Sequence, residues 1–146
     1  MGKKILIMHG PNLNLLGERE PGIYGDTNFD TLNAHLQELA ASLGMEAEIF
    51  QSNHEGALID KLHACRRECA GVVLNAGAYT HYSYAIADAI KAIRIPVIEV
   101  HISNIFARDA FRSHSVIAPV CSGSISGFGL LSYDLAVRAL GEGAAE

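Results

Sequence analysis

The chain has little charge, few cysteines and no long apolar run. Charged residues make up 18% of its 146 residues, and the formal net charge is −5. No run of Lys or Arg exceeds two residues, so no nucleic-acid surface is expected. No apolar stretch approaches the roughly 20 residues that cross a membrane. The apolar run after Lys3-Lys4 stops at His9, unlike a signal peptide. We therefore expect a cytoplasmic protein that binds neither nucleic acid nor membranes.

Cysteine is represented by Cys65, Cys69 and Cys121. The first two are four residues apart on a predicted helix and so share a face, a spacing that would suit half a metal site. No second ligand pair has matching spacing. We interpret all three as small thiols, buried or half-buried, in a reducing compartment.

Several cofactor motifs are also missing. The chain has neither a Walker P-loop nor a dinucleotide G-x-G-x-x-G. Residues 11–16 are not the Ser/Thr/Gly-rich phosphate loop of a flavodoxin, and residues 123–127 lack the central serine of a nucleophile elbow. Asn12 and Asn75 stand where a phosphorelay receiver has magnesium-binding carboxylates. Cofactor-dependent chemistry is therefore disfavoured, and no cofactor is expected.

What the chain does contain is alternating strand and helix patterns. Strands are expected at residues 5–8, 45–51, 71–75, 96–101 and 115–120. Four helices are expected: one capped by Thr27 or Asn28 and ended by Gly44, one capped by Ser52-Asn53, one with its apolar face between residues 86 and 93, and one over residues 130–140. Residues 103–113 read as a loop with a short helix, and residues 123–129 as a flexible turn.

This alternation predicts an α/β fold: a doubly wound, five-stranded parallel sheet covered on both faces. The expected strand order is 2-1-3-4-5, as in flavodoxin-like folds, in a single domain over residues 1–146. Ligands bind where such a sheet reverses its strand order, beyond the carboxyl ends of strands 1, 3 and 4. The polar residues expected to converge there are Asn12, Arg19, Tyr24, Asn75, His81, His101 and Ser103.

The stretch from residue 5 to residue 25 is a strand that runs into a long polar loop, which favours a lid. We place Asn12 in the rigid floor of the site and the lid hinges at Gly17 and Gly25, so that residues 18–25 should be displaced or poorly ordered in an empty crystal. Tyr24 is either a base or an aromatic that packs as part of the lid. A base requires its pKa to fall by about two to three units, roughly 3–4 kcal/mol, which nearby guanidinium groups supply. Arg19 and Arg112 are the candidates.

Among the histidines, His101 differs because it ends a strand at the crevice. It suits a general acid. A zinc site with His81 and Glu99 is the alternative, and we rank it well below acid chemistry. His9 lies beside the core, where we expect it to hydrogen-bond to backbone. His35 and His63 are expected to be solvated.

Five segments resemble the type II 3-dehydroquinate dehydratases, and the resemblance spans nearly the whole chain. They are residues 10–17 (GPNLNLLG), 19–25, 75–81 (NAGAYTH), 99–104 (EVHISN) and 108–114. Ala76 stands where many members have proline, and residues 121–126 are unusually rich in serine. Neither departure touches a residue assigned to chemistry.

The resemblance implies a reaction, the reversible loss of water from 3-dehydroquinate to give 3-dehydroshikimate, without a metal. It also implies residue roles. Tyr24 is the base, supported by Arg19, and His101 is the acid, oriented by Glu99. Asn12 and Asn75 hold a water at the enolate oxygen. The residues implied to bind substrate are Asn75, His81, Asp88, Ile102, Ser103 and Arg112.

The family also implies a dodecamer of four trimers, in which Asp88 reaches a neighbouring subunit's site. Ile86, Ala89, Ile90 and Ile93 are predicted to face the sheet, which turns Tyr84 and Asp88 outward together. Two rival readings remain: a non-catalytic flavodoxin-like module that binds a small anion or a partner protein, and a degenerate family member kept for assembly.

Overall fold

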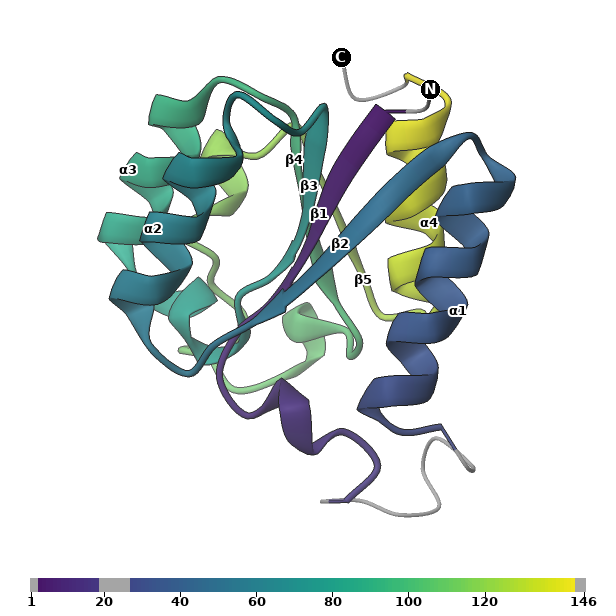
Figure 1. Cartoon of the computed structure of the whole chain (residues 1–146). Coiled ribbons are helices and arrows are strands. Elements are labelled where there is room, and N and C mark those ends of the chain that lie inside the picture. Colours follow the sequence, from purple (N-terminus) through teal and green to yellow (C-terminus); the bar gives the residue numbers. More distant parts are fainter. Residues whose placement is uncertain (1–2, 19–26, 144–146) are drawn as a thin grey trace.

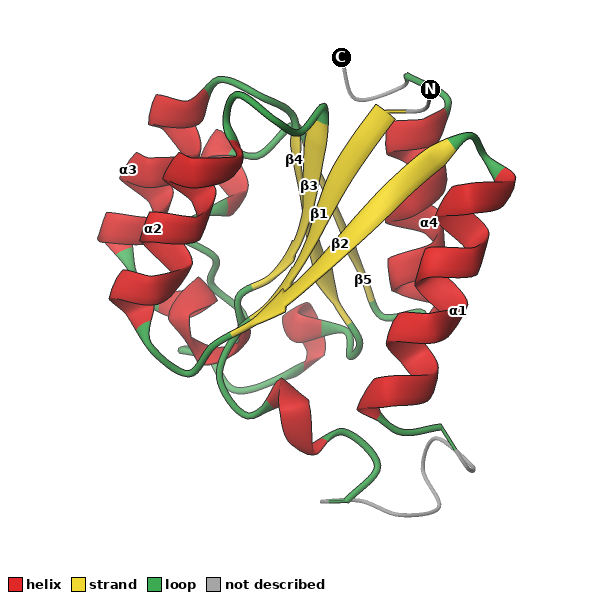
Figure 2. Ribbon diagram, in the orientation of Figure 1, coloured by secondary structure: helices red, strands yellow, loops and turns green. Residues whose placement is uncertain are grey.

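The structure is a computed structural model that describes residues 3–18 and 27–143. Five parallel strands form one sheet in the order β2-β1-β3-β4-β5, which confirms the predicted order (Figure 1). The strands are β1 (Lys3–His9), β2 (Met45–Gln51), β3 (Gly71–Asn75), β4 (Val97–His101) and β5 (Gly123–Ser126). The helices are α1 (Phe29–Ser42), α2 (Glu55–Cys65), α3 (Tyr84–Ile93) and α4 (Leu131–Gly141), shown in red in Figure 2.

Helices cover both faces of the sheet, with α2 and α3 on one side and α1 and α4 on the other (Figure 1). Successive side chains of a strand point to opposite faces. Leu6 and Met8 therefore pack under α2 and α3, whereas Ile5 and Ile7 pack under α1 and α4. Burial on both sides explains why β1 reads as a continuous apolar run rather than as an alternating one.

Helix ends follow the predicted caps in part. Asn28 caps α1 and forms a capping box with Thr31, as the prediction allowed. The predicted cap of α2 is wrong, because the residue at that position is His54 and it makes no side-chain cap bond. The Asn53 side chain instead accepts the backbone N–H of Asn12, and Ser52 accepts that of His54.

The predicted fifth strand at residues 115–120 is wrong. Residues Ala118–Val120 form a 3₁₀ turn with a proline in its first positions. Proline has no N–H to give to a strand ladder, so this apolar stretch cannot extend the sheet. The fifth strand is β5, within the segment predicted as a flexible turn. Ile117 is fully buried in the core beneath α2 and α3.

The carboxyl ends of β1, β3 and β4 meet at one edge of the sheet, the lower edge in Figure 1. Gly10 lets the loop after β1 touch the loop after β3. Its N–H donates to the Asn75 carbonyl at 2.7 Å, and a Cβ at position 10 would lie 2.5 Å from the Ala76 carbonyl oxygen. Any side chain at position 10 would push these loops apart. Close contact between them is therefore built into the backbone.

Two further features bear on the sequence predictions. In the part of the chain that the structure describes, no helix has both the length and the apolar character to cross a membrane. Cys65 and Cys69 are buried and Cys121 is half-buried. Burial raises the pKa of the Cys65 and Cys121 thiols to about 12, so they stay protonated and unreactive.

Candidate active site

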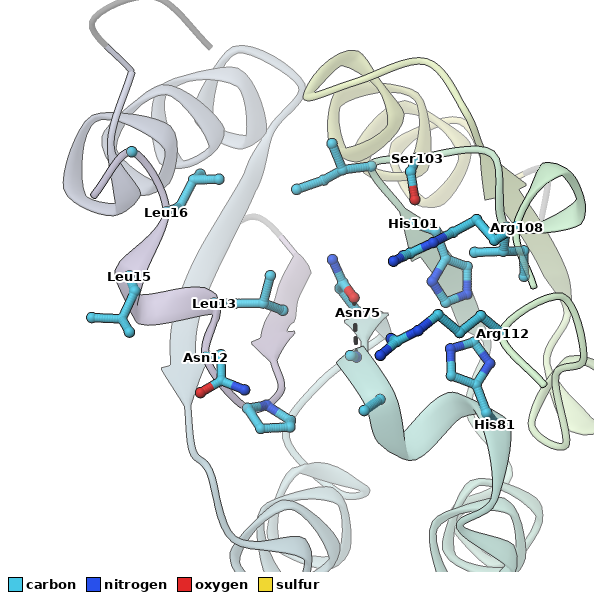
Figure 3. A pocket seen from close by; sticks show the side chains of 16 residues that line it. Asn12, Leu13, Leu15, Leu16, Asn75, His81, His101, Ser103, Arg108 and Arg112 are labelled. Atoms are coloured by element: carbon cyan, nitrogen blue, oxygen red, sulfur yellow. Dashed lines mark hydrogen bonds between the residues drawn. The ribbon is translucent and has the colours of Figure 1, made fainter. Parts of the chain in front are cut away.

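A cavity of about 490 Å³ opens at this edge of the sheet, between the loops that follow β1, β3 and β4. In Figure 3, Asn75 lies in the middle, with Asn12 and Leu13 on one side of it and His101, Arg108 and Arg112 on the other. The residues that line the cavity are Pro11, Asn12, Leu13, Leu15, Leu16, Gly17, Asn75, Gly77, Ala78, His81, His101, Ile102, Ser103, Ile105, Arg108 and Arg112. The cavity therefore lies where the sheet reverses its strand order, the topological switch point at which a ligand site was predicted.

His101 and Glu99 form a buried pair at the end of β4. They are two residues apart on a strand, so both side chains point to the same face. Nε2 of His101 lies 2.6 Å from Oε2 of Glu99, which also accepts the Ser115 hydroxyl at 2.7 Å. Burial raises the pKa of Glu99, but the hydrogen bonds from His101 and Ser115 outweigh it, and the net pKa lies below the usual value. Glu99 is therefore ionised, and Nε2 of His101 carries a proton.

Asn75 ends β3 and is nearly fully buried, with its side chain at the middle of the cavity (Figure 3). Its Oδ1 accepts the Gly77 N–H at 3.1 Å, and its Nδ2 donates to the Tyr133 hydroxyl at 3.0 Å. Asn12, by contrast, is exposed at the edge of the cavity rather than buried in its floor. Its backbone has the left-handed conformation, with φ of 69°.

His81, Arg108 and Arg112 form the wall of the cavity that lies across Asn75 from Asn12 and Leu13 (Figure 3). Nδ1 of His81 donates to the His114 carbonyl at 2.8 Å, which fixes the proton on Nδ1 and leaves Nε2 as the acceptor in the neutral ring. Arg108 is exposed and Arg112 is half-buried, and both line the cavity. Two guanidinium groups at one cavity make it suitable for an anion.

The remaining predicted residues are placed as follows. Ile102 and Ser103 line the cavity directly after His101. Asp88 is exposed on α3, as is Tyr84, and neither lines the cavity. Arg19 and Tyr24, like the predicted lid over residues 18–25 beyond Glu18, lie outside the described residues, so those predictions stay predictions.

Across residues 3–18 and 27–143, no three His, Cys, Asp or Glu side chains come together in a group that could hold a metal ion. Glu99, the third ligand of the zinc alternative, is committed to His101 and Ser115.

Sequence reasoning missed three residues around the site. Arg108 lines the cavity, and its position four residues before Arg112 in a motif segment was a usable signal. Tyr133 and Asn33 support the site from α4 and α1. Only side-chain packing across the fold reveals them, because Tyr133 lies 58 residues from Asn75 in sequence.

Comparison with known proteins gives a consistent result over nearly the whole chain. The family model described as dehydroquinase class II matches residues 3–141. A 3-dehydroquinate dehydratase of Caldicellulosiruptor saccharolyticus is 58% identical over 141 residues, covering 96% of this chain and 97% of the relative. One from Bacillus cereus is 56% identical over 140 residues, covering 96% of both chains.

Solved structures give the same picture. The type II dehydroquinase from Butyrivibrio crossotus superimposes with a TM-score of 0.90 at 50% identity and covers 95% of this chain and 97% of its own. A 3-dehydroquinate dehydratase-like protein from Bifidobacterium longum superimposes with a TM-score of 0.73 at 33% identity, with 99% of each chain covered.

Proposed function

The chain belongs to the class II dehydroquinase family, and we propose that it removes water from 3-dehydroquinate, as a cytoplasmic single-domain enzyme of the shikimate pathway. The observation that carries the proposed chemistry is the buried His101–Glu99 pair, whose histidine lines the same cavity as Arg108 and Arg112. A protonated imidazole held by a carboxylate can give a proton to a departing hydroxide. The cationic wall suits a substrate that is a carboxylate and becomes an enolate.

The first step is removal of a proton next to the ketone. We assign it to Tyr24 as phenolate, with Arg19 beside it. Both residues lie outside the described part of the chain. The assignment is supported by Arg108 and Arg112, because cations at a cavity favour the anionic form of a phenol placed there.

The second step places negative charge on the ketone oxygen. Asn12 and Asn75 are proposed to hold a water that donates to this oxygen. The geometry at Asn75 supports the assignment, because its oxygen is taken by Gly77 while its nitrogen has hydrogens to donate. Preorganised donors of this kind stabilise a developing oxyanion.

In the third step the C–O bond breaks and the hydroxide leaves as water, with a proton from His101. Nε2 of His101 is held by Glu99, so the proton is given from Nδ1 of the imidazolium. Glu99 does not line the cavity and acts by orienting the ring and stabilising its charge.

Substrate binding is proposed to use the rest of the wall. Nε2 of His81 can accept a hydrogen bond from a ring hydroxyl, because Nδ1 is committed to the His114 carbonyl. Arg112 donates to a second hydroxyl. Ile102 and Ser103 present backbone N–H groups to the substrate carboxylate. No metal and no cofactor enters the scheme, so turnover should survive EDTA.

We further propose a dodecamer of four trimers in which Asp88 reaches the site of a neighbouring subunit. The support is that Asp88 is exposed and does not line the cavity of its own chain. Mass measurement under native conditions tests the assembly. An Asp88→Ala variant that keeps the assembly but binds substrate more weakly would support the shared site, whereas unchanged binding would contradict it.

Two variants test the assignment of base and acid. Tyr24→Phe should remove nearly all turnover without unfolding the protein, and His101→Ala should slow elimination while substrate still binds. His63→Ala, an exposed histidine on α2, is the matched control and should keep wild-type activity. Wild-type turnover by Tyr24→Phe would exclude it as the base. Loss of binding by His101→Ala as large as its loss of turnover would make His101 an anchor rather than an acid.

A further inference from the structure

A chain of buried hydrogen bonds runs from α1 through β1 and α4 to the centre of the cavity. Nε2 of His9 lies 2.9 Å from Oδ1 of Asn33, and Nδ1 of His9 lies 3.0 Å from the Tyr133 hydroxyl. The same hydroxyl accepts Nδ2 of Asn75 at 3.0 Å. His9 and Tyr133 are fully or almost fully buried, and neither lines the cavity.

The strand register explains why these groups meet. Ile5 and Ile7 of β1 face α1 and α4, so His9, two residues further on, faces them as well. Asn75 pairs with His9 across the β1–β3 ladder, and Val73 puts Asn75 on the same face. The ends of two central strands are thus joined under α4 by side chains, in addition to their backbone ladder.

The donor and the acceptor of each hydrogen bond in this chain follow from the bond that Gly77 makes to Asn75. The Gly77 N–H can only donate, so the atom of Asn75 that it meets is the oxygen. The nitrogen of Asn75 then donates to the Tyr133 oxygen, and the Tyr133 hydroxyl must donate to Nδ1 of His9. Nε2 of His9 therefore carries the ring proton and donates to the oxygen of Asn33.

The ionisation of the two central groups agrees with this order. Burial lowers the pKa of His9 to about 4, so its Nδ1 is unprotonated at neutral pH. Burial also raises the pKa of the Tyr133 hydroxyl, which keeps its proton. Neither group gains or loses a proton in the neutral range, so the chain keeps one arrangement.

We propose that Tyr133 and His9 are positioning residues that hold the carboxamide of Asn75 with its nitrogen, and not its oxygen, available to the cavity. Gly77 grips only one end of this amide. The contact at the nitrogen fixes the rotation of the amide plane and leaves the second hydrogen of Nδ2 for a ligand. This inference rests on the proposed function, in which donors at Asn75 stabilise an oxyanion.

A double-mutant cycle on turnover separates positioning from general support of the fold. Removing one oxyanion donor costs about 100-fold or more in kcat, which is the expectation for Asn75→Ala. Tyr133→Phe keeps the ring and removes the hydroxyl, and we expect kcat to fall roughly tenfold, with KM changing less. In the Asn75→Ala background the same substitution should change kcat by less than about twofold. An equal loss in both backgrounds, or no loss in the wild-type background, overturns the proposal.

Val137→Ala is the matched control for stability. Val137 lies one turn after Tyr133 on α4 and is fully buried without a polar group. The Val137→Ala substitution should lower the melting temperature and leave kcat within about twofold of the wild-type value. If Val137→Ala lowers kcat as much as Tyr133→Phe does at a similar melting temperature, loosening of α4 explains both and the proposal fails.

A nitrogen-15 NMR measurement on the intact wild-type protein does not depend on turnover. We expect His9 to show the Nε2–H tautomer at neutral pH and the Asn75 carboxamide hydrogens to exchange slowly, with faster exchange in Tyr133→Phe. An Nδ1–H tautomer, or exchange that Tyr133→Phe leaves unchanged, overturns the hydrogen-bond order. If the wild-type protein makes no product from 3-dehydroquinate, the proposed function fails while this measurement still decides the inference.

Discussion

Neutralising Glu99 should weaken the proposed acid without disturbing the shape of the site. In the wild type, Nε2 of His101 lies 2.6 Å from a carboxylate oxygen of Glu99. Glu99→Gln keeps the side-chain length and leaves an amide oxygen that can accept the hydrogen bond from Nε2. What is lost is the negative charge beside the imidazolium. Since Glu99 is fully buried, water does not screen that charge.

The size of the effect follows from the bond that changes. A hydrogen bond to a charged group contributes about 1.5–3 kcal/mol, against about 1 kcal/mol between neutral groups. The difference of roughly 0.5–2 kcal/mol corresponds to a loss of about 2- to 30-fold in kcat. KM should change little, because Glu99 does not line the cavity.

Turnover at saturating 3-dehydroquinate tests this reasoning. Ser115→Ala removes the other hydrogen bond to Oε2 and keeps the charge, so it should lower kcat by less than about threefold. A Glu99→Gln variant with wild-type kcat would refute the role of Glu99.

Three further predictions concern binding and stability. Arg112→Ala and Arg108→Ala should each raise the KM for 3-dehydroquinate, because both guanidinium groups line the cavity; an unchanged KM for both would contradict an anion site. Leu36→Ala should lower the free energy of unfolding by about 2–5 kcal/mol in a denaturant titration and leave kcat unchanged, because this fully buried side chain packs α1 on the sheet. A smaller change would mean that the core around residue 36 collapses into the space left by the substitution. The pKa of Glu99 lies below its usual 4.5 in the folded protein, so the stability that its ionised form contributes is present above that pH and is lost as pH falls through the lower folded value. Unfolding curves of Glu99→Gln should therefore depend less on acidic pH than those of the wild type, and identical acid dependence would count against the depressed pKa.

The central part of the fold was predictable because its signals are local. The strands from residues 45–51 and 71–75 appear at their predicted bounds, and β1 is longer than predicted by two residues at its start and one at its end. Apolar runs and helical spacing suffice when an element is buried along its length. The short helix expected within residues 103–113 is the 3₁₀ turn Ile105–Ala107.

The errors arose where the signal is weak or distant. The edge strand β5 is rich in Ser and Gly and is only partly buried, so it carries no apolar pattern. The apolar stretch before it contains Pro119, which should have argued against a strand. His9 was expected to bond to backbone, but it bonds to Asn33 and Tyr133. No local pattern reveals a partner 124 residues away.

The site was predictable to a similar extent and for a different reason. The strand order brings Asn12, Asn75, His81, His101 and Ser103 to one cavity, as the switch-point rule predicts. The orientation of each group was not predictable. The tautomer of His81 depends on the His114 carbonyl, and the direction of the Asn75 amide depends on Gly77 and Tyr133.

The most direct test is to mix the purified protein with 3-dehydroquinate and record ultraviolet absorbance. The proposed dehydration creates a double bond conjugated with the ketone, so absorbance of the enone should rise and continue to rise in the presence of EDTA. A folded protein that gives no enone signal at saturating substrate would contradict the account and favour a non-catalytic module that binds a small anion or a partner.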